Sequence, residues 1–336
     1  MARIVFYCNE EKSHLEIFEY YRQDVEALEA LGHEVVVCTR YREIPWRFDA
    51  MFVWWWTYAL WPVALSRLLG RPSLVTGVFN FRFPPTLEGR DYHQRPAWHR
   101  ALISAATRLC SLNLFINETE LRDCAAFFGL ANARLYPCSV HEDYLRGPSA
   151  SRRMALFNLA WNGKGNLIRK GIPELLQAVR ILKEDGLDVR LFHGGPVGDG
   201  TEFLRGRIAE LELAEQVTWL GPLSREDKLD LLRSCEIYVQ PSHYEGFGLA
   251  TAEAMGCGAC VITCDVGAVR SVVGECGIYV TPGSPHDLAA AIRRALGDAA
   301  LRGRLQAEAA QRARAVFAPE KKRERLRQYL AELGIS

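Results

Sequence analysis

The sequence predicts an α/β protein made of two Rossmann-like, doubly wound domains that face a central cleft. Short apolar segments typical of buried strands alternate with longer segments typical of helices, which is the pattern of a parallel sheet covered on both faces. The pattern runs twice, with a break at Gly147–Ser151, and 336 residues suffice for about two domains. We therefore expect one domain at 1–148 and a second at 152–318.

Apolar segments between turn signals locate the individual strands. In the first half we expect strands at Arg3–Cys8, Glu34–Cys38, Asp49–Trp56, Ser73–Phe79 and Asn113–Ile116. In the second half we expect them at Met154–Ala160, Val189–Phe192, Gln216–Leu220, Ile237–Val239, Ala259–Thr263 and Gly277–Val280. Helices are expected between the strands, among them Leu15–Leu31, Ile172–Leu182 and the last helix, Pro319–Leu333.

Composition and charge indicate a cytoplasmic enzyme that does not bind nucleic acid. The net charge is +1, so no overall field draws the chain to nucleic acid. The sequence shows no secretory signal, and its longest uncharged run, which starts at Ala50, contains Pro62 and is shorter than the roughly 20 residues of a spanning helix. Ten cysteines without framework spacing indicate reduced thiols. Cys257, Cys260 and Cys264 lack the second pair of a zinc site, so we expect no metal.

One segment, from Ser242 to Gly258, carries the strongest chemical signal. Two carboxylates, Glu245 and Glu253, flank a turn that follows a strand and opens into an Ala-rich helix. Gly246 and Gly248 remove side chains, so a ligand can lie against main-chain N–H groups. Those groups belong to the first turn of the helix, where partial positive charge favours a phosphate. An anion with hydroxyl-rich groups at both ends, such as a nucleoside diphosphate sugar, fits this arrangement.

The segment and its surroundings resemble the donor site of the retaining GT-B glycosyltransferases of family four, the glycosyl transferases group 1. The resemblance runs from about Ala155 to Ala295 and includes Val217–Ser224 before the site and Cys257–Gly283 after it. It implies that Glu245 holds hydroxyls of the transferred sugar and that Glu253 binds the ribose. It also implies that the N–H groups of Phe247, Gly248 and Leu249 meet the diphosphate of a UDP or GDP sugar. The donor pocket would include Gly246, with Leu220 and Leu223 near the base. The last helix, 319–336, would cross back onto the first domain.

A second group of candidate site residues, all basic, lies in the segment Asn162–Gly171. The resemblance implies that Lys170, just before a glycine, binds the donor diphosphate and acts at the catalytic centre. Lys164 stands where the family has an Arg, so the charge is kept but the bidentate fork is lost. Either Lys164 alone fills the place of this Arg in binding the diphosphate, or Arg169 contributes to that binding as well. We expect replacement of Lys170 to reduce transfer with little effect on stability.

No Asp-x-Asp pair occurs in the chain, so a metal-bridged diphosphate is not expected. Cationic side chains and a helix terminus would then neutralise the leaving group. The Gly-rich stretch His193–Gly200 is interrupted by Pro196 and does not match a dinucleotide fingerprint. By resemblance this loop edges the nucleotide pocket.

The amino-terminal half departs from the family pattern. Asn9–His14 replaces the usual Gly-Gly loop, and Tyr136–His141 replaces the usual end of the first domain. Asn80 stands in a turn where family members often have a His; it either hydrogen-bonds a sugar hydroxyl or simply forms the turn.

Aromatic and basic residues gather in this same half. Trp54, Trp55, Trp56, Tyr58 and Trp61 form either the core or a platform for the acceptor or a membrane. The stretch Arg67–Arg108 holds seven Arg against two acids. We expect a basic-aromatic loop there, with Arg82, Arg90 and Arg95 binding a lipid-phosphate or acidic-glycan acceptor; an ordinary solvated loop is the alternative.

These features predict a metal-independent enzyme that transfers a hexose from a nucleoside diphosphate sugar to a hydroxyl of a glycan, lipid-linked sugar or small molecule. The sequence leaves open whether the protein also binds peripherally to the inner face of the membrane. Two alternatives remain: a nucleotide-sugar epimerase of the same fold, and a non-catalytic partner subunit that binds sugar nucleotides. A nicotinamide enzyme is disfavoured because the glycine fingerprint is missing.

Overall fold

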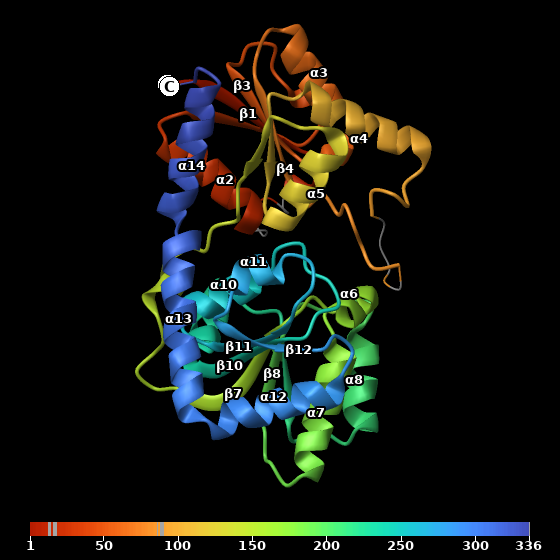
Figure 1. The fold of residues 1–336 in the computed structure, drawn as a ribbon, viewed down its shortest axis with the longest axis vertical. Helices are drawn as coiled ribbons and strands as arrows, with labels where there is room; N and C mark the ends of the chain where they lie inside the picture. The colour runs from red at the N-terminus through yellow and green to blue at the C-terminus, as the bar shows by residue number, and fades with distance from the viewer. Residues whose placement is uncertain (13–14, 16–18, 86, 88–90, 336) are drawn as a thin grey trace. The chain divides into compact units, whose positions relative to one another are not determined.

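The computed structural model describes residues 1–12, 15, 19–85, 87 and 91–335. The chain divides into two compact units. The first comprises the described residues of Met1–Phe83, Arg90–Ser139 and Phe317–Ser336, and the second comprises those of Pro84–Gly89 and Val140–Val316. Each unit is built on a six-stranded parallel sheet with helices on both faces (Figure 1). The predicted class, two doubly wound α/β domains, is confirmed.

The first sheet has the strand order β2-β1-β3-β4-β5-β6. Its strands are β1 (Arg3–Cys8), β2 (Glu34–Cys38), β3 (Ala50–Trp54), β4 (Ser73–Gly77), β5 (Leu112–Phe115) and β6 (Ala133–Leu135). The helices of this unit are α2 (Glu19–Ala30), α3 (Leu60–Leu68), α4 (Ala97–Leu109), α5 (Glu118–Phe128) and α14 (Pro319–Glu332). Short 3-10 turns, η1 (Tyr41–Glu43) and η2 (Trp56–Tyr58), precede β3 and α3.

Successive side chains along the strands of this sheet point to opposite faces, so a core forms on each face. On β1, Val5 and Tyr7 pack with residues of α3, α4 and α5, whereas Ile4 and Phe6 pack with residues of α2 and α14. Figure 1 shows α2 and α14 on one side of the strands and α4 and α5 on the other. Both faces of the sheet are buried, which explains why its strands are continuously apolar.

The C-terminal helix α14 is anchored to the first unit by a buried ion pair. The Lys322 Nζ lies 2.8 Å from Asp24 Oδ1 on α2, and both side chains are almost wholly buried. Asp24 also accepts hydrogen bonds from the Tyr136 hydroxyl at 2.9 Å and the Trp54 indole at 2.8 Å. The carboxylate therefore has a cation and two neutral donors to offset its burial.

The second sheet has the order β12-β11-β10-β7-β8-β9. Its strands are β7 (Arg153–Leu159), β8 (Leu191–Gly194), β9 (Val217–Gly221), β10 (Cys235–Gln240), β11 (Cys260–Cys264) and β12 (Gly277–Val280). The helices are α6 (Lys164–Arg169), α7 (Ile172–Glu184), α8 (Thr201–Glu210), α9 (Arg225–Ser234), α10 (Leu249–Gly256), α11 (Val269–Val273), α12 (Pro285–Gly297) and α13 (Ala299–Phe317), and η3 (Glu142–Arg146) precedes β7. Cys260 and Cys264 lie in its core, and Cys257 is buried beside them in the chain.

The aromatic cluster near β3 divides between core and surface. Trp54 and Trp56 are buried, and the Trp55 indole donates to the Tyr21 hydroxyl at 2.7 Å. Tyr58 and Trp61, one turn further, are exposed. The cluster is therefore neither wholly core nor wholly a surface platform, because the chain leaves the sheet at Trp54.

The expectation of a basic-aromatic loop over the whole of Arg67–Arg108 was wrong, although the described residues between β4 and α4 do form a loop. The stretch contains β4 and most of α4, and Phe79 and Phe81 are buried in the core of the first unit. Strand β6 was missed, since it has only three residues and is half-buried at the sheet edge. Residues 13–14 of the Asn9–His14 loop and residues 16–18 of the expected first helix lie outside the described residues. Among the described residues, none of the helices is both long and apolar enough to cross a membrane.

Candidate active site

Glu245 lies in the turn between β10 and α10, at the carboxyl end of a central strand. Its side chain is only 4% exposed. Its carbonyl accepts a hydrogen bond from the amide of Ala268 at 2.9 Å. Gly267, at φ 54°, packs so closely that a Cβ there would lie 2.1 Å from that carbonyl oxygen. Only glycine permits this approach, which holds the turn against the neighbouring chain segment.

Lys170 is the cation that faces Glu245. Its Nζ lies 2.5 Å from Glu245 Oε1. Lys170 ends α6, and the next residue, Gly171, has φ 68° and lies against Pro241 after β10. A Cβ on Gly171 would come within 2.1 Å of the Pro241 carbonyl oxygen. The sequence Lys-Gly is therefore needed to bring this loop against the turn that carries Glu245.

The structure distinguishes the roles of Arg169 and Lys164. Arg169 Nη1 lies 3.9 Å from Glu245 Oε2 and donates to the Tyr244 carbonyl at 3.1 Å. Lys164 is exposed, and its ammonium lies 5.8 Å from the ring centroid of Phe203. The guanidinium beside the carboxylate is thus that of Arg169, and Lys164 points to a different neighbour.

A hydrogen-bond chain inside the unit orients the Glu245 carboxylate. The Ser242 hydroxyl donates to Glu245 Oε1 at 2.7 Å, and the Gln240 amide donates to Ser242 Oγ at 3.2 Å. The Tyr238 hydroxyl donates to Gln240 Oε1 at 2.9 Å. All three side chains are buried on β10 or just after it. Because every link has one donor and one acceptor, the chain fixes which way each group points.

Charge around Glu245 keeps it ionised despite its burial. Burial alone would raise the pKa of Glu245, but the charges of Lys170 and Arg169, with hydrogen bonds from Lys170 and Ser242, hold that pKa below its usual value. Burial, and then the charges of Glu245 and Glu253, raise the pKa of Tyr238 well above its ordinary value. Both carboxylates therefore act on the same buried phenol, so they lie in one region of the unit.

The first turn of α10 presents main-chain N–H groups. Gly248 stands at its N-cap with φ 90°, and none of the described side chains caps the helix there. Gly246 and Leu249 are partly exposed, while Phe247 is buried. The first amides of a helix have no carbonyl partner within the helix, and the helix dipole makes this end partly positive. The turn that holds Glu245 thus leads directly into a position suited to an anion.

Glu253, in the second turn of α10, is paired with a residue that the motif did not reveal. Its Oε1 accepts a hydrogen bond from Lys228 Nζ on α9 at 2.8 Å, and only 2% of Glu253 is exposed. The same ammonium lies 4.9 Å from the ring centroid of Tyr144. Burial alone would lower the pKa of Lys228, but the charge of Glu253 outweighs it and raises that pKa. Lys228 is therefore charged at neutral pH.

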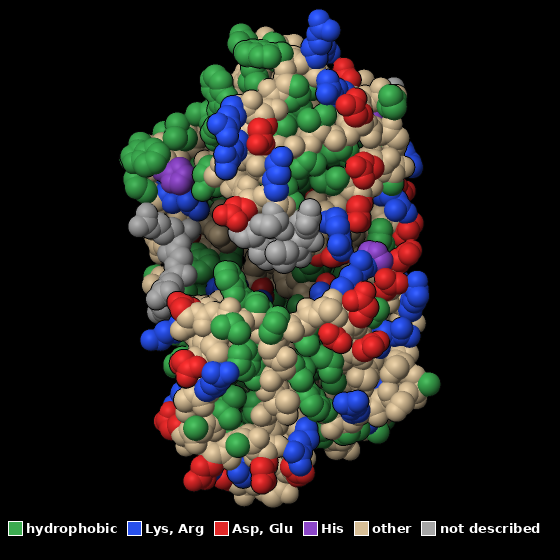
Figure 2. All heavy atoms as spheres, turned by 180° about the vertical axis from the view of Figure 1, so that it is seen from behind, with side chains coloured by type: hydrophobic (Ala, Val, Ile, Leu, Met, Phe, Trp, Pro, Cys, Tyr) green, Lys and Arg blue, Asp and Glu red, His purple; other side chains and the backbone are tan. Residues whose placement is uncertain are grey.

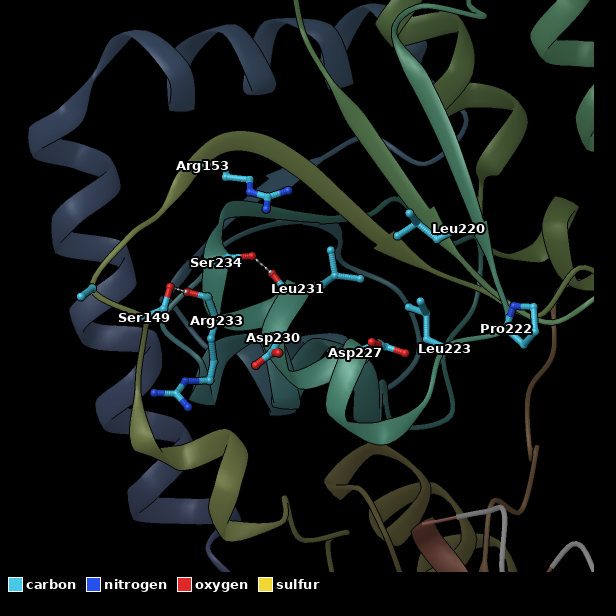
Figure 3. A pocket seen from close by; sticks show the side chains of 11 residues that line it. Ser149, Arg153, Leu220, Pro222, Leu223, Asp227, Asp230, Leu231, Arg233 and Ser234 are labelled. Atoms are coloured by element: carbon cyan, nitrogen blue, oxygen red, sulfur yellow. Dashed lines mark hydrogen bonds between the residues drawn. The ribbon is translucent and has the colours of Figure 1, made fainter.

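Leu220 and Leu223 line a pocket of about 670 Å³ along α9. Figure 3 shows apolar side chains from the β9–α9 connection and from α9, with Arg153, Asp227 and Asp230 around them. The described residues that line this pocket do not include Lys170, Glu245 or Glu253. The structure therefore groups the two leucines with each other and with α9, but not with the ion pair.

The glycines of the loop Gly194–Gly200 serve close packing. A Cβ on Gly195 would lie 1.8 Å from the carbonyl oxygen of Ala160, and one on Gly198 would lie 2.5 Å from that of Asn162. Next to this loop, both ring nitrogens of the buried His193 lie 2.9 Å from an amide oxygen, those of Asn158 and Asn162. The loop is thus pressed against the β7–α6 connection, the segment that leads to Lys170.

Comparison with known proteins identifies this region. Residues 165–312 match the family model described as glycosyl transferases group 1, and the matched segment contains Lys170, Glu245 and Glu253. The chain carries a group 1 glycosyltransferase domain. The resemblance inferred from the motifs is confirmed.

Relatives and solved structures extend this finding. A D-inositol 3-phosphate glycosyltransferase of Stackebrandtia nassauensis is 35% identical over 121 residues, which make up 34% of this chain and only 27% of that protein. Sucrose-phosphate synthase of Thermosynechococcus elongatus superposes with a TM-score of 0.77 at 18% identity, over 99% of both chains. Anabaena HepE in complex with UDP and glucose superposes with a TM-score of 0.77 at 17% identity. The superposition covers 99% of this chain and 100% of the HepE chain. The fold is that of the GT-B glycosyltransferases.

Outside the group 1 glycosyltransferase domain, the residues expected to bind the acceptor are held in different ways. Asn80 has φ 54°, and the buried carboxylate of Glu120 accepts the main-chain N–H groups of Phe79 and Asn80 at 3.0 and 2.7 Å. Arg82 is exposed and lies 3.2 Å from Asp123. Arg95 is half-buried, and Arg90 lies outside the described residues. The turn at Asn80 is therefore held by Glu120, a residue that sequence reasoning did not single out.

Proposed function

We propose that this protein is a retaining glycosyltransferase that moves a hexose from a nucleoside diphosphate sugar to an acceptor hydroxyl. The observation that supports this proposal most directly is the ion pair of Lys170 with the buried Glu245. It lies at the turn that leads into the N-terminus of α10, where none of the described side chains caps the helix. A cation, a row of main-chain N–H groups and a fixed carboxylate then lie at one turn. These are the groups needed to hold a diphosphate next to a sugar.

In this proposal the donor diphosphate binds the N–H groups of residues 247–249. Lys170 and Arg169 neutralise its charge, with a weaker contribution from Lys164. Glu253, which is held by a hydrogen bond from Lys228, accepts hydrogen bonds from the ribose hydroxyls. Leu220 and Leu223 form the side of the pocket nearer the base. The donor nucleotide is UDP or GDP, and the HepE complex with UDP makes UDP the first to test.

The transfer step follows from the same contacts. Glu245 holds hydroxyls of the hexose and orients its anomeric carbon. The bond from that carbon to the β-phosphate oxygen breaks, and a bond to the acceptor oxygen forms on the same face of the sugar. The acceptor proton passes to the departing phosphate oxygen, so no side-chain base is needed. Lys170 and the α10 terminus stabilise the charge that develops on the phosphate, without a metal ion.

The acceptor, a glycan, a lipid-linked sugar or a small molecule, is assigned to the first unit. Asn80, Arg82, Arg90 and Arg95 are the proposed contacts. Arg82 is mostly exposed and paired with a single carboxylate, so it can exchange that partner for an anionic acceptor.

A panel of nucleotide sugars, each tested with and without acceptors, decides this proposal. We expect transfer with one donor, release of the nucleoside diphosphate, and by NMR a product whose anomeric configuration equals that of the donor. Inversion would contradict the same-face step. Isomerisation of the donor without any acceptor would replace the proposal by an epimerase, and binding without turnover would indicate a non-catalytic subunit. A chelator should leave the activity in place, and strict dependence on added Mg²⁺ or Mn²⁺ would contradict the role given to Lys170.

A further inference from the structure

Two helices of the first unit expose large apolar side chains in regular stripes. On α3, Trp61 is 57% exposed and Leu68, two turns later, is 81% exposed. On α4, Trp98 is 66% exposed and Leu102, one turn later, is 39% exposed. The opposite sides of the two helices pack into the core through residues such as Val63 and Ile103. These exposed residues are therefore not needed to hold the helices on the sheet.

The two stripes belong to one region of the surface. Helix α3 packs against α4, and both contact η2, whose Tyr58 is also exposed. Figure 2 shows hydrophobic side chains gathered at the upper left, over the part of the first unit where α3 and α4 lie, with Lys or Arg and His side chains beside them. We call this region, made of Tyr58, Trp61, Leu68, Trp98 and Leu102, the α3–α4 face.

The charges on this face have one sign. Helices α3 and α4 contain Arg67, Arg100 and Arg108 and no Asp or Glu. Between Ala50 and Asn117 the sequence holds only two acids, Glu88 and Asp91. Arg67 and Arg108 are exposed, and no ion pair of either is found within the described part of the chain. An apolar stripe flanked by unneutralised guanidinium groups is thus left on the surface.

We propose that the α3–α4 face docks on an anionic lipid bilayer. Trp side chains favour the boundary between lipid tails and headgroups, and arginine binds phosphate with a planar fork of N–H groups. A face that combines both binds in the plane of the interface rather than across it. Helices of 9 and 13 residues are far too short to span a bilayer, so the contact is peripheral.

Charge complementarity favours a bilayer over a second copy of this chain. A symmetric dimer through this face would place the same patch opposite itself, and with it the arginines of both copies. An anionic membrane instead supplies phosphates for the arginines and acyl chains for Trp61, Leu68, Trp98 and Leu102. The proposal goes beyond the transfer reaction and does not depend on it, although docking would bring the enzyme close to a lipid-linked acceptor.

Vesicle flotation of the full chain tests the proposal. We would compare vesicles of phosphatidylcholine alone with vesicles that also contain phosphatidylglycerol. The wild type should bind the anionic vesicles at least tenfold more tightly, and added salt should weaken this binding. The variant Trp61→Ser/Trp98→Ser should lose at least tenfold in affinity. The matched control is Trp46→Ser, since Trp46 is 75% exposed but lies outside the face, and it should bind like the wild type.

Further outcomes decide the interpretation. Quenching of tryptophan fluorescence by brominated lipid should occur in the wild type and in Trp46→Ser, and should be lost in the double variant. Equal binding to neutral and anionic vesicles, or equal binding by the double variant, would overturn the proposal. Sedimentation that shows a wild-type dimer and a monomeric double variant would assign the face to a second copy instead. Loss of lipid binding with intact donor binding would leave the proposed transfer reaction standing.

Discussion

Lys170 and Glu245, which are 75 residues apart in the chain, form a buried ion pair with 2.5 Å between Nζ and Oε1. The pair exists because two glycines permit close backbone contact. Gly171 lies against Pro241 and Gly267 lies against Glu245 itself. A cation from the α6–α7 connection is thereby fixed at the turn between β10 and α10, and this relationship leads to the first two predictions.

Replacement of Lys170 by Met should reduce both transfer and stability. The expectation from sequence was a loss of transfer with little effect on stability. Glu245 is buried, however, and without Lys170 it keeps only the more distant Arg169 as a cation among the described residues, with the Ser242 hydroxyl as a neutral donor. Breaking a buried ion pair costs up to about 3–5 kcal/mol. We therefore expect a loss of that size in the free energy of unfolding in urea, and transfer reduced by about 10²-fold or more.

Lys183→Met, on α7, is the control. Lys183 is half-buried and donates to the Glu212 carbonyl at 2.6 Å, so its loss should leave transfer unchanged and should lower stability by only about 1 kcal/mol.

A double variant separates the two effects. Lys170→Met/Glu245→Gln removes both charges, so stability should recover by several kcal/mol relative to Lys170→Met, on the order of the buried-charge penalty. Transfer should stay low because the diphosphate has lost its cation. Recovery of transfer in the double variant would show that Lys170 acts only by balancing Glu245.

Arg169 should matter more than Lys164 for donor binding. Arg169 lies beside Glu245, whereas Lys164 is directed to Phe203. A charge-assisted hydrogen bond contributes about 1.5–3 kcal/mol, so Arg169→Ala should weaken UDP binding by about ten- to a hundredfold. Lys164→Ala should weaken it by less than about threefold. Calorimetry with UDP measures the affinity of both variants. A larger loss in Lys164→Ala than in Arg169→Ala would show that Lys164, and not Arg169, takes the place of the family's arginine.

Lys322 should be essential for the stability of the first unit. Lys322→Met leaves Asp24 buried with the Tyr136 and Trp54 donors but without a cation. We expect a loss of about 3–5 kcal/mol in the free energy of unfolding. The neighbouring Lys321→Met is the matched control, because the Lys321 side chain is half-exposed and forms a surface ion pair with Glu324. Equal stability of both variants would show that the Asp24 carboxylate is satisfied by neutral donors alone.

His193 should make stability depend on pH below neutrality. Burial lowers the pKa of His193 from 6.5 to about 4. A base with a lowered pKa contributes fully to stability above its unfolded pKa, and that contribution falls as pH drops from about 6.5 towards 4. A shift of this size corresponds to about 3 kcal/mol. The wild type should lose this stability over that window, His193→Gln should not, and His286→Gln, at an exposed histidine, should behave like the wild type. Equal slopes in all three proteins would show that the amide oxygens of Asn158 and Asn162 accommodate the protonated ring.

Much of the fold and part of the site could be predicted from the sequence. Continuous apolar strands with helices between them indicate covered parallel sheets. Of the twelve strands in the described part of the chain, eleven were expected at the places where they occur. Glu245, Lys170 and the α10 terminus could be proposed from sequence because their signals are local: a strand end, a glycine and a helix start. The structure brings Lys170 and Glu245 together. The high arginine content of the stretch Arg67–Arg108 suggested a solvated loop, but β4 and most of α4 lie within it and both pack into the core.

The rest depends on contacts between distant segments. Lys228 reaches Glu253 only because α9 packs on α10, and no local pattern marks that contact. Whether Arg169 or Lys164 faces Glu245 depends on how the short helix α6 is turned about its axis. A sequence motif that contains both cations cannot specify this orientation. Glu120 holds the Asn80 turn across 40 residues, and a helical glutamate gives no sign of such a partner.

The central claim is that Lys170 and the turn into α10 bind the diphosphate of a sugar-nucleotide donor. Calorimetric titration of UDP and of uridine, into the wild type and into Lys170→Met below its unfolding transition, tests it most directly. We predict that UDP binds the wild type, that uridine binds much more weakly, and that Lys170→Met lowers the affinity for UDP by about ten- to a hundredfold while leaving that for uridine unchanged. Equal affinity of the two proteins for UDP would contradict the claim.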